Sequence, residues 1–444
     1  MMLLSLPVPG PATRPSNGIY MHAWVRLVHY VLITSNSLDY LSLRQRYYCP
    51  TQRARGVSGS IMQKFVLSGG LGLLGQRILQ HIVSSGHGCV RVMIVDTAPL
   101  QAAKSGGPPT AASGITGDPA VGIGAKGEVL GSSTARGAAA PIVNDSTGAV
   151  SVVRGDLSCS DVAAAIKSFA GGDDGGGDRA ETTSSSTLSV FHLASVMSGQ
   201  GEEDFGEALR VNIDGTRSLL DTCRQIGGRP RFVFASSIAA FGGGEQVTDE
   251  TKLLPQAIIT LTQSTYGMTK ACAELLVNDC TRKGFVDGRI ARLPTVVVRP
   301  GPPNPAATGC FSSVPKAVLH GQHFISPVSP DLRHACVGLS SAVDGLIRLH
   351  DASEADFGPR DRAITLPAAS LSLRDLEESA ARLARELGRP PGTVSYEPDS
   401  AVEAVVKAMP SAVKVSNRTA NLGLLESAGA HEIVEDYVKG ERLR

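Results

Sequence analysis

Two side chains capable of proton transfer stand one helical turn apart. Tyr266 and Lys270 fall in the segment Tyr-Gly-Met-Thr-Lys, and their i, i+4 spacing places both on one face of a helix. A free tyrosine has a pKa of about 10, and a neighbouring ammonium group lowers that pKa by favouring the phenolate. With Ser237 holding the reacting oxygen, the pair would remove an alcohol proton while hydride leaves the carbon. Such pairs also occur on ordinary helix surfaces, so the motif alone is weak.

A glycine-rich turn earlier in the chain fits the same chemistry. Residues 65–67 are a short apolar run typical of a buried strand, and residues 74–82 follow a helical apolar pattern. Gly69, Gly72 and Gly75 stand around the junction between them. A strand, a glycine turn and a helix in this order let the backbone approach a pyrophosphate and offer it free N–H groups. The same pattern also fits any tight strand-to-helix turn.

An acidic residue follows at the distance expected of a dinucleotide site. Residues 90–95 form a second apolar run that ends in Asp96, close to the ~20-residue spacing typical of these sites. A carboxylate there can accept hydrogen bonds from a ribose diol and would repel a 2′-phosphate. The sequence therefore predicts NAD rather than NADP.

Strands and helices alternate through the first 300 residues. We expect further strands at 150–153, 188–191, 231–234 and 290–298. We expect helices at 204–224, at 266–283 with Leu275 and Leu276 facing inward, and around Ile166 and Phe169. This alternation predicts an α/β fold with a Rossmann-type doubly wound parallel sheet. Ligands bind at the carboxyl ends of such strands, so one rim should carry Gly69, Asp96, Asp156, Ala194, Ser237 and Pro294.

Residues 301–444 are predicted to form a smaller C-terminal α/β lobe that binds substrate and closes over this rim. A helix should begin at Ser372, carry Leu376, Leu383 and Leu387 on its apolar face, and end at Gly388. Further helices are expected at 402–408 and 431–438. Residues 61–300 would form the NAD-binding domain.

Three segments do not fit this pattern. Residues 1–60 hold six arginines and one acid, Asp39, which indicates either an organellar transit segment or an over-extended gene model that precedes Met62. The protein would accordingly be cytoplasmic or organellar. Residues 101–148 and 171–187 are rich in small and polar residues, which cannot bury enough surface to order themselves, and are predicted to be low-complexity insertions.

The overall composition excludes several functions. Of the 444 residues, 42 are Lys or Arg and 41 are Asp or Glu, a net charge of +1 that gives no reason to expect nucleic acid or an anionic membrane as partner. The eight cysteines form no C-x-x-C pair, so reduced thiols are expected rather than disulfides or a metal site. No apolar run is long enough to span a bilayer.

Taken together, these motifs resemble the extended short-chain dehydrogenase/reductase family, the NAD-dependent epimerase/dehydratase group. The resemblance covers residue 64 to about residue 437, apart from the insertions. It implies Ser237, Tyr266 and Lys270 as the catalytic trio and a homodimer formed by helices 204–224 and 266–283. It also implies a set of cofactor contacts: Gly69, Gly72, Leu73, Leu74, Asp96, Asp156, Leu157, Ala194, Ser195, Tyr266, Lys270 and Pro294.

Substrate contacts are expected from Ser237, Tyr266, Ser198 and Arg299. Ser198 precedes a glycine and could equally belong to an ordinary turn. Arg299 could pair a substrate carboxylate, or it could be a surface arginine at a strand end.

Two further polar residues are expected to serve the fold. His192 follows an apolar strand, where a histidine is more often part of the core than a catalyst. Asn212 is expected to hydrogen-bond backbone groups and order neighbouring loops.

Three functions remain in competition. Segments such as 191–224 and 282–289 resemble a branch of the family that oxidises a small hydroxy acid. The runner-up is an epimerase or dehydratase acting on a nucleotide sugar. The third is a non-enzymatic NAD-binding regulator, which an intact Ser237, Tyr266 and Lys270 disfavours.

Overall fold

The computed structural model describes most of the chain after residue 61. The described residues are 62–84, 90–97, 143–144, 150–171, 187–241, 262, 264–301, 306–357, 361–413, 415–424 and 428–441. The predicted N-terminal extension and nearly all of both predicted insertions lie outside this part. One expectation needs correction: Val143–Asn144, inside the first insertion, forms strand β3, which pairs antiparallel with β4 and so belongs to the sheet.

A large sheet forms the centre of the molecule. Its strand order is β11-β7-β6-β5-β1-β2-β4-β3, and every neighbouring pair is parallel except β3 and β4. This confirms the predicted Rossmann-type α/β fold. The strands are β1 (Gln63–Ser68), β2 (Val90–Asp96), β4 (Val150–Arg154), β5 (Thr187–His192), β6 (Arg231–Ser237), β7 (Asp287–Leu293) and β11 (Ala363–Thr365).

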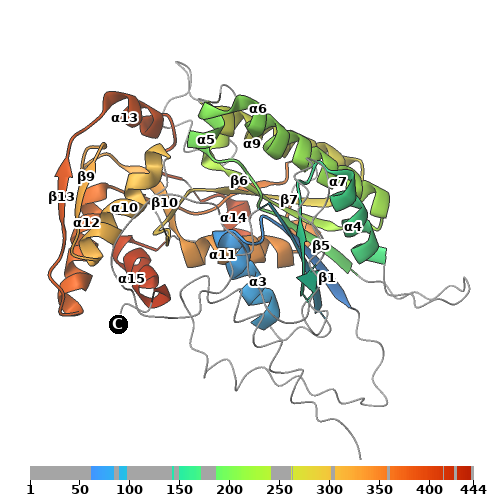
Figure 1. Cartoon of the computed structure of the whole chain (residues 1–444), viewed down its shortest axis with the longest axis horizontal. Coiled ribbons are helices and arrows are strands. Elements are labelled where there is room, and N and C mark those ends of the chain that lie inside the picture. Colours follow the sequence, from blue (N-terminus) through green and yellow to red (C-terminus); the bar gives the residue numbers. More distant parts are fainter. Residues whose placement is uncertain are drawn as a thin grey trace, which may run out of the picture.

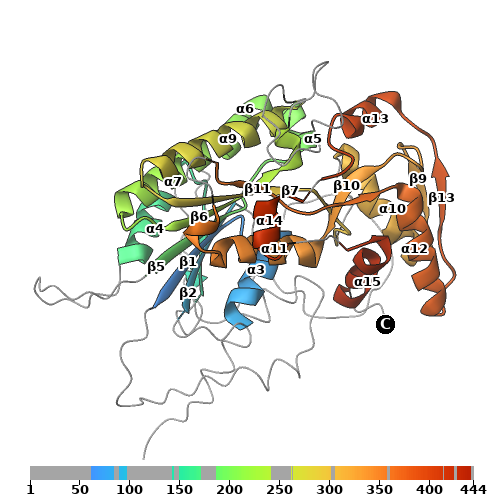
Figure 2. The same cartoon turned by 180° about the vertical axis from the view of Figure 1, so that it is seen from behind.

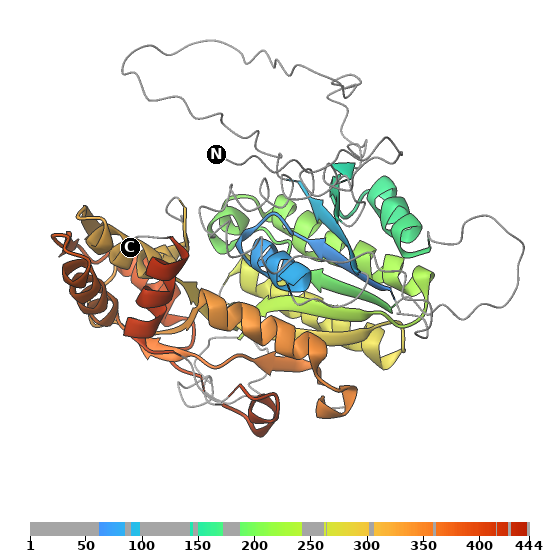
Figure 3. The ribbon, with the colours of Figure 1, turned by 90° about the horizontal axis from the view of Figure 1, so that it is seen from below.

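Helices cover both faces of this sheet (Figure 1, Figure 3). One face carries α4 (Ser160–Gly171), α7 (Gly215–Ile226) and α9 (Thr265–Arg282), and the other carries α3 (Leu73–Ser84) and α11 (Leu339–Asp351). Strand β1 serves both layers: Phe65 and Leu67 belong to the core under α3 and α11, and Val66 belongs to the opposite core. Because both faces of β1 are buried, its residues 65–67 are all apolar. Burying each such side chain contributes roughly 1.5–3 kcal/mol to stability.

Two expected elements are interrupted. The helix predicted at 204–224 consists of α6 (Phe205–Leu209), a π-helical turn η1 (Arg210–Asp214) and α7. The strand predicted at 290–298 ends at Leu293, because Pro294 cannot donate to the ladder. After it, β8 (Thr295–Val297) leaves the large sheet and pairs with β10 (His334–Gly338).

One side chain faces the other way from the prediction. Leu275 was expected to point inward on the helix at 266–283, yet it is 64% exposed. The inner face of α9 instead carries Ala273 and Val277, which belong to the core beneath it, and Leu276 is partly buried against the same core.

A smaller lobe lies at one end of the large sheet (Figure 1, Figure 2). Its core joins helices α10, α12 and α15 to two small sheets, and Ser372 begins α12 with a capping box to Asp375, as predicted. Its elements are sheet β12-β10-β8 with β12 (Ala369–Leu371), sheet β13-β9 with β9 (His323–Ser326) and β13 (Thr393–Tyr396), and helices η3 (Ala307–Gly309), α10 (Cys310–Leu319), α12 (Leu373–Glu386), α13 (Ser400–Lys407), and α15 (Ala430–Gly440).

The chain passes between the two bodies more than once. After β8, α10, β9 and β10, it returns to the large sheet as α11 and β11, and later as α14 (Asn417–Asn421), which packs against β11. Residue 300 therefore marks only the first point at which the chain leaves the large sheet. Strand β11, which lies after this predicted boundary, returns to pair with β7 at the edge of that sheet.

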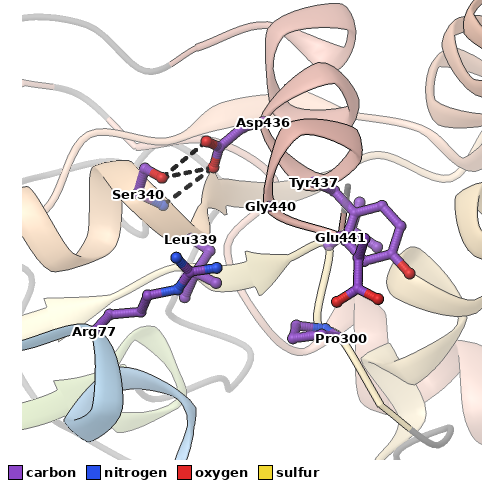
Figure 4. Close-up of a pocket in the computed structure, with 9 residues that line it drawn as sticks. Arg77, Pro300, Leu339, Ser340, Asp436, Tyr437, Gly440 and Glu441 are labelled. Atoms are coloured by element: carbon purple, nitrogen blue, oxygen red, sulfur yellow. Dashed lines mark hydrogen bonds between the residues drawn. The ribbon is translucent and has the colours of Figure 1, made fainter. Parts of the chain in front are cut away.

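The joint between the bodies contains a small cavity (Figure 4). Arg77 of α3, Ser340 at the start of α11 and Asp436 of α15 border it, and the Ser340 hydroxyl donates to both Asp436 carboxylate oxygens at 2.9 and 2.7 Å. Its volume of about 50 Å³ is far below the ~300–1,000 Å³ of ligand pockets. The cavity is therefore too small to be a ligand site, and the hydrogen bonds between Ser340 and Asp436 instead connect the smaller lobe to α11.

Candidate active site

A cleft of about 690 Å³ lies at the carboxyl ends of the central strands, between the large sheet and the smaller lobe. Helix α13 and the residues after it supply one wall through Val405, Ala408 and Met409, which the sequence did not single out. Most predicted site residues border this cleft: Gly69, Gly72, Leu73, Leu74, Ser195, Ser198, Ser237, Tyr266, Lys270, Pro294 and Arg299. Four described residues that were predicted to contact the cofactor do not border it: Asp96, Asp156, Leu157 and Ala194.

The glycine turn joins β1 to α3 and is packed too tightly for side chains. Gly69 has a φ of 70°, and a Cβ there would lie 2.7 Å from the backbone nitrogen of Ala194. A Cβ on Gly75 would lie 2.5 Å from the Cα of Gly70. The first turn of α3 can border the cleft because these residues are glycines, and its N-terminus can receive an anionic group.

Asp96 supports the turn from the end of β2. Its Oδ2 accepts a hydrogen bond from the backbone N–H of Leu71 at 2.9 Å. The carboxylate thus lies directly against the glycine turn, although it does not border the cleft itself.

The other three residues are held by neighbouring protein groups. Asp156 accepts hydrogen bonds from the N–H and hydroxyl of Ser158 at 2.8 and 2.7 Å and forms an ion pair with Arg210. Leu157 is buried in the core beside Gly215. Ala194 provides the backbone against which Gly69 packs.

Ser237 and Tyr266 meet across the cleft floor. Ser237 ends β6 and caps the short helix η2 (Ile238–Ala240), and its hydroxyl accepts from the N–H of Ala239 at 3.1 Å. Its side chain also lies close enough to the phenol of Tyr266 to lower the pKa of that phenol. Ser264 caps the start of α9, with its hydroxyl accepting from the N–H of Gly267 at 3.0 Å.

Gly267 allows this meeting, and sequence reasoning missed it. A Cβ at Gly267 would lie 2.2 Å from the carbonyl oxygen of Ala239. Only glycine lets the first turn of α9 approach η2 this closely, and that approach brings Tyr266 to Ser237. The sequence shows that Gly267 directly follows Tyr266, but it does not show that Gly267 packs against the carbonyl oxygen of Ala239.

Lys270 lies one turn along α9 and is buried. Its Nζ donates to the carbonyl oxygen of Ala235 at 2.8 Å and lies 5.6 Å from the centroid of the Tyr266 ring. Burial lowers the pKa of Lys270 to about 7, and the negative charge of Glu274 opposes this shift. The lysine is therefore close to its titration point at neutral pH.

The electrostatics of Tyr266 differ from the prediction. Burial raises the pKa of Tyr266, while the side chain of Ser237 and the charge of Arg299 lower it. The expected cation was Lys270, but the cation that acts on the phenol is Arg299. Burial in turn lowers the pKa of Arg299, and Tyr266 opposes that shift. Arg299 is thus part of the cleft wall and not a solvated surface residue.

Three buried residues beneath Lys270 were not identified from the sequence. Glu274 pairs with Arg292 at 2.7 Å and accepts a hydrogen bond from Ser236. Glu274 stands four residues after Lys270, which was a visible signal, but its partner comes from another strand.

His192 and Asn212 have the structural roles that were predicted. The ring of His192 is hydrogen-bonded to Ser68 and Thr216, at 2.6 and 2.8 Å. Asn212, in the π-helical turn, accepts from the N–H of Val196 at 2.8 Å and donates to its carbonyl at 3.1 Å, which orders the loop after β5. Both side chains therefore support the cleft without facing it.

The described residues contain no group of three or more His, Cys, Asp or Glu side chains able to hold a metal ion. Among the helices of this part, none combines the length and apolar character needed to cross a membrane.

Comparison with known proteins finds relatives among dehydrogenases. A model of the 3-beta hydroxysteroid dehydrogenase/isomerase family matches residues 163–308. D-erythronate dehydrogenase of Cupriavidus necator is 38% identical over 255 residues, which cover 57% of this chain and 75% of that protein. D-erythronate dehydrogenase of Haemophilus influenzae is 32% identical over 262 residues, which cover 58% of this chain and 79% of that protein.

A solved structure agrees over nearly the whole fold. The nucleoside-diphosphate-sugar epimerase from Agrobacterium tumefaciens has a TM-score of 0.64 and 26% identity, and the match covers 88% of this chain and 100% of that one. The chain therefore belongs to the extended short-chain dehydrogenase/reductase family, the NAD-dependent epimerase/dehydratase group, and is an oxidoreductase. Membership of this family implies a nicotinamide dinucleotide as cofactor.

Proposed function

We propose that the protein is an NAD-dependent dehydrogenase that oxidises a small sugar acid, D-erythronate to 2-dehydro-D-erythronate. The observation that carries the proposal is that Ser237, Tyr266 and Lys270 border the same cleft as the glycine turn. The Ser237 side chain lowers the pKa of Tyr266, and Lys270 Nζ lies 5.6 Å from the centroid of the Tyr266 ring. The two relatives named D-erythronate dehydrogenase support the choice of substrate.

The glycine turn fits a dinucleotide. Gly69, Gly72 and the first turn of α3 border the cleft, and a Cβ on Gly69 would collide with the Ala194 backbone. We assign the pyrophosphate to this turn. Asp96, which supports the turn, would repel a 2′-phosphate and accept hydrogen bonds from a ribose diol, so NAD is the preferred cofactor. When bound, the nicotinamide supplies the acceptor for the electron pair that leaves the substrate carbon.

The protein's own residues move the proton. Tyr266 accepts the proton of the substrate hydroxyl, and Ser237 holds the same oxygen through its hydroxyl. The positive charge of Arg299 favours the phenolate. We assign a second, smaller contribution to the ammonium of Lys270, whose Nζ lies 5.6 Å from the centroid of the Tyr266 ring. The substrate loses a hydroxyl proton and a C–H bond and becomes a ketone, while Tyr266 returns its proton to solvent before the next cycle.

The charges in the cleft favour a substrate with one carboxylate. Among the described lining residues, the cations are Lys270 and Arg299 and the acid is Glu202. Lys270 belongs to the proton-transfer trio, which leaves Arg299 to pair a carboxylate, with Ser198 as a second contact. A nucleotide sugar, the runner-up, carries a diphosphate that one arginine would pair poorly.

Net cofactor reduction separates the two functions. Purified protein should form NADH with NAD and a panel of erythronate, threonate and longer aldonic acids, with erythronate used most efficiently. An epimerase returns its hydride and accumulates no NADH. Conversion of a nucleotide sugar to its epimer without NADH formation would establish the runner-up.

We further propose a homodimer formed through α9 and the α6–α7 region. Leu275 on α9 and Phe205 on α6 are 64% and 56% exposed, which is unusual for large apolar side chains on neighbouring helices. A second copy seated on this face would bury both.

A further inference from the structure

A buried ion pair lies directly beneath the proton-transfer trio. The carboxylate of Glu274 accepts from Arg292 Nη2 at 2.7 Å and from Arg292 Nε at 3.0 and 3.1 Å. It also accepts from the Ser236 hydroxyl at 2.5 Å. These three residues, which we call the catalytic floor, are each less than 8% exposed.

Stability alone does not explain such a pair. Withdrawing two charges from water is costly, and apolar replacements of the same volume are often neutral or stabilising. What distinguishes this pair is its position. Glu274 follows Lys270 by one turn of α9, and Ser236 stands between Ala235, whose carbonyl holds Lys270, and Ser237.

We propose that Glu274, held in place by Arg292, is a positioning residue that keeps Lys270 in its ammonium form and fixes it against the end of β6. This inference rests on the proposed dehydrogenase function, because it assigns a role in that proton transfer. Arg292 is in turn packed over the ring of Phe241, 4.9 Å from its centroid, and Phe241 borders the cleft.

Of the groups around Lys270, Glu274 is the one whose charge changes the pKa of the lysine. Tyr266 and Glu274 face it from α9, His192 from β5, and the Phe234 ring from β6, with the centroid 4.8 Å from Nζ. Burial and the charge of Lys270 lower the pKa of His192 to about 3, so this ring is neutral near pH 7.

More distant charges act through their partners. Arg292, on β7, reaches Lys270 through Glu274, and Arg299 acts on Tyr266. Burial lowers the pKa of Lys270 to about 7, and Glu274 raises it. A small change in this balance therefore changes the charged fraction of Lys270 at neutral pH.

The sign of the effect can be predicted for two charge variants. Glu274→Gln keeps the side-chain shape but leaves Arg292 charged, because a guanidinium does not deprotonate. The pKa of Lys270 should then fall by about one unit, with less ammonium at pH 7. The double variant E274Q/R292Q removes both charges and should return the pKa toward its original value. Glu274→Asp retains the carboxylate and should keep the pKa within a few tenths of a unit.

The titration of Lys270 can be followed without any substrate. NMR of lysine-labelled protein, with the Lys270 signal assigned by its loss in Lys270→Arg, reports the pKa in the wild type and the three variants. An unchanged Lys270 pKa in folded Glu274→Gln would overturn the proposal. So would an equal fall in Glu274→Asp, because a carboxylate is still present there. If the double variant does not fold, the comparison of the Gln and Asp variants still decides.

Turnover supplies a second readout. At pH 7 the ammonium fraction of Lys270 should fall about 5-fold in Glu274→Gln, so kcat should fall about 5-fold while the Kd for NAD changes little, and Glu274→Asp should recover most of the loss. If the wild type oxidises no sugar acid, the proposed function fails, but the NMR titration still tests the floor.

Discussion

The glycine turn borders the cleft, the catalytic floor lies beneath the proton-transfer trio, and the two are built by different means. The turn consists of backbone against backbone: Gly69 packs on Ala194, and Gly75 on Gly70. The floor consists of buried side chains, with Glu274 and Arg292 in a charged pair. The turn therefore tolerates no added atom, whereas the floor should tolerate a change of shape better than a change of charge.

The two regions also differ in how they reach function. The turn provides space and N–H groups for an anion, and both depend on conformation. The floor acts on the protonation of Lys270, which depends on long-range charge. Variants of each region should accordingly fail in different measurements, the first in cofactor affinity and the second in pH dependence.

The largest effect is expected at the residue above the floor. Tyr266→Phe should keep the fold and the Kd for NAD, because the ring still packs, and should reduce kcat by ~10²–10⁴ by removing the base. Steady-state kinetics and calorimetric NAD binding measure the two quantities. Turnover near that of the wild type at neutral pH would show that another group takes the proton.

The turn is tested by one methyl group. In Gly75→Ala the new Cβ would lie 2.5 Å from the Gly70 Cα, so the backbone must shift, at a cost of roughly 1–3 kcal/mol. We expect NAD affinity to fall about tenfold or more by calorimetry. Gly171→Ala is the matched control, since its Cβ would have no neighbour within 4 Å. Equal effects of the two variants would refute the packing argument.

Variants of Asp96 test whether the charge beside the glycine turn sets the preference for NAD over NADP. Asp96→Asn keeps an acceptor for the Leu71 N–H but removes the negative charge, so the preference for NAD over NADP should narrow about tenfold. Asp96→Ala should in addition weaken both cofactors, because the turn loses its support. An unchanged ratio of kcat/KM values in both variants would assign the preference to other residues.

The smallest effect on turnover is expected on the outer face of α9. Leu275→Glu places a charge on the proposed dimer surface and should shift the protein toward monomer in light scattering at micromolar concentration. Ile325→Glu, at a position 52% exposed on β9 of the smaller lobe, is the matched control and should not change the mass. A wild type that is already monomeric would contradict the dimer.

The sequence predicted the turn far better than the floor, for a physical reason. The turn is local: an apolar run, three glycines and a helical pattern lie within 20 residues, and the fold of β1 and α3 follows from them. The large sheet, Asp96 beside the turn and the Ser372 cap were readable in the same way. Pro294 could be seen in the sequence, but the sequence did not show that β8 after it would leave the large sheet and pair with β10.

The catalytic floor could not be predicted from the sequence, because its three residues come from β6, α9 and β7 and meet only in the folded protein. The same holds for Arg299, whose charge reaches Tyr266 from beyond β8, and for Gly267, whose neighbour lies in η2. Leu275 was misplaced because an apolar residue on a helix gives no sign of which face meets the core when both faces carry apolar residues.

The central claim is net oxidation at C2 of a sugar acid, and isotopic substitution tests it most directly. With C2-deuterated D-erythronate and NAD, we expect deuterium to appear in the reduced cofactor in a one-to-one ratio with 2-keto acid, both determined by mass spectrometry. Tyr266→Phe should slow both equally. Deuterium retained on the sugar carbon without cofactor reduction, or released to water, would contradict the account.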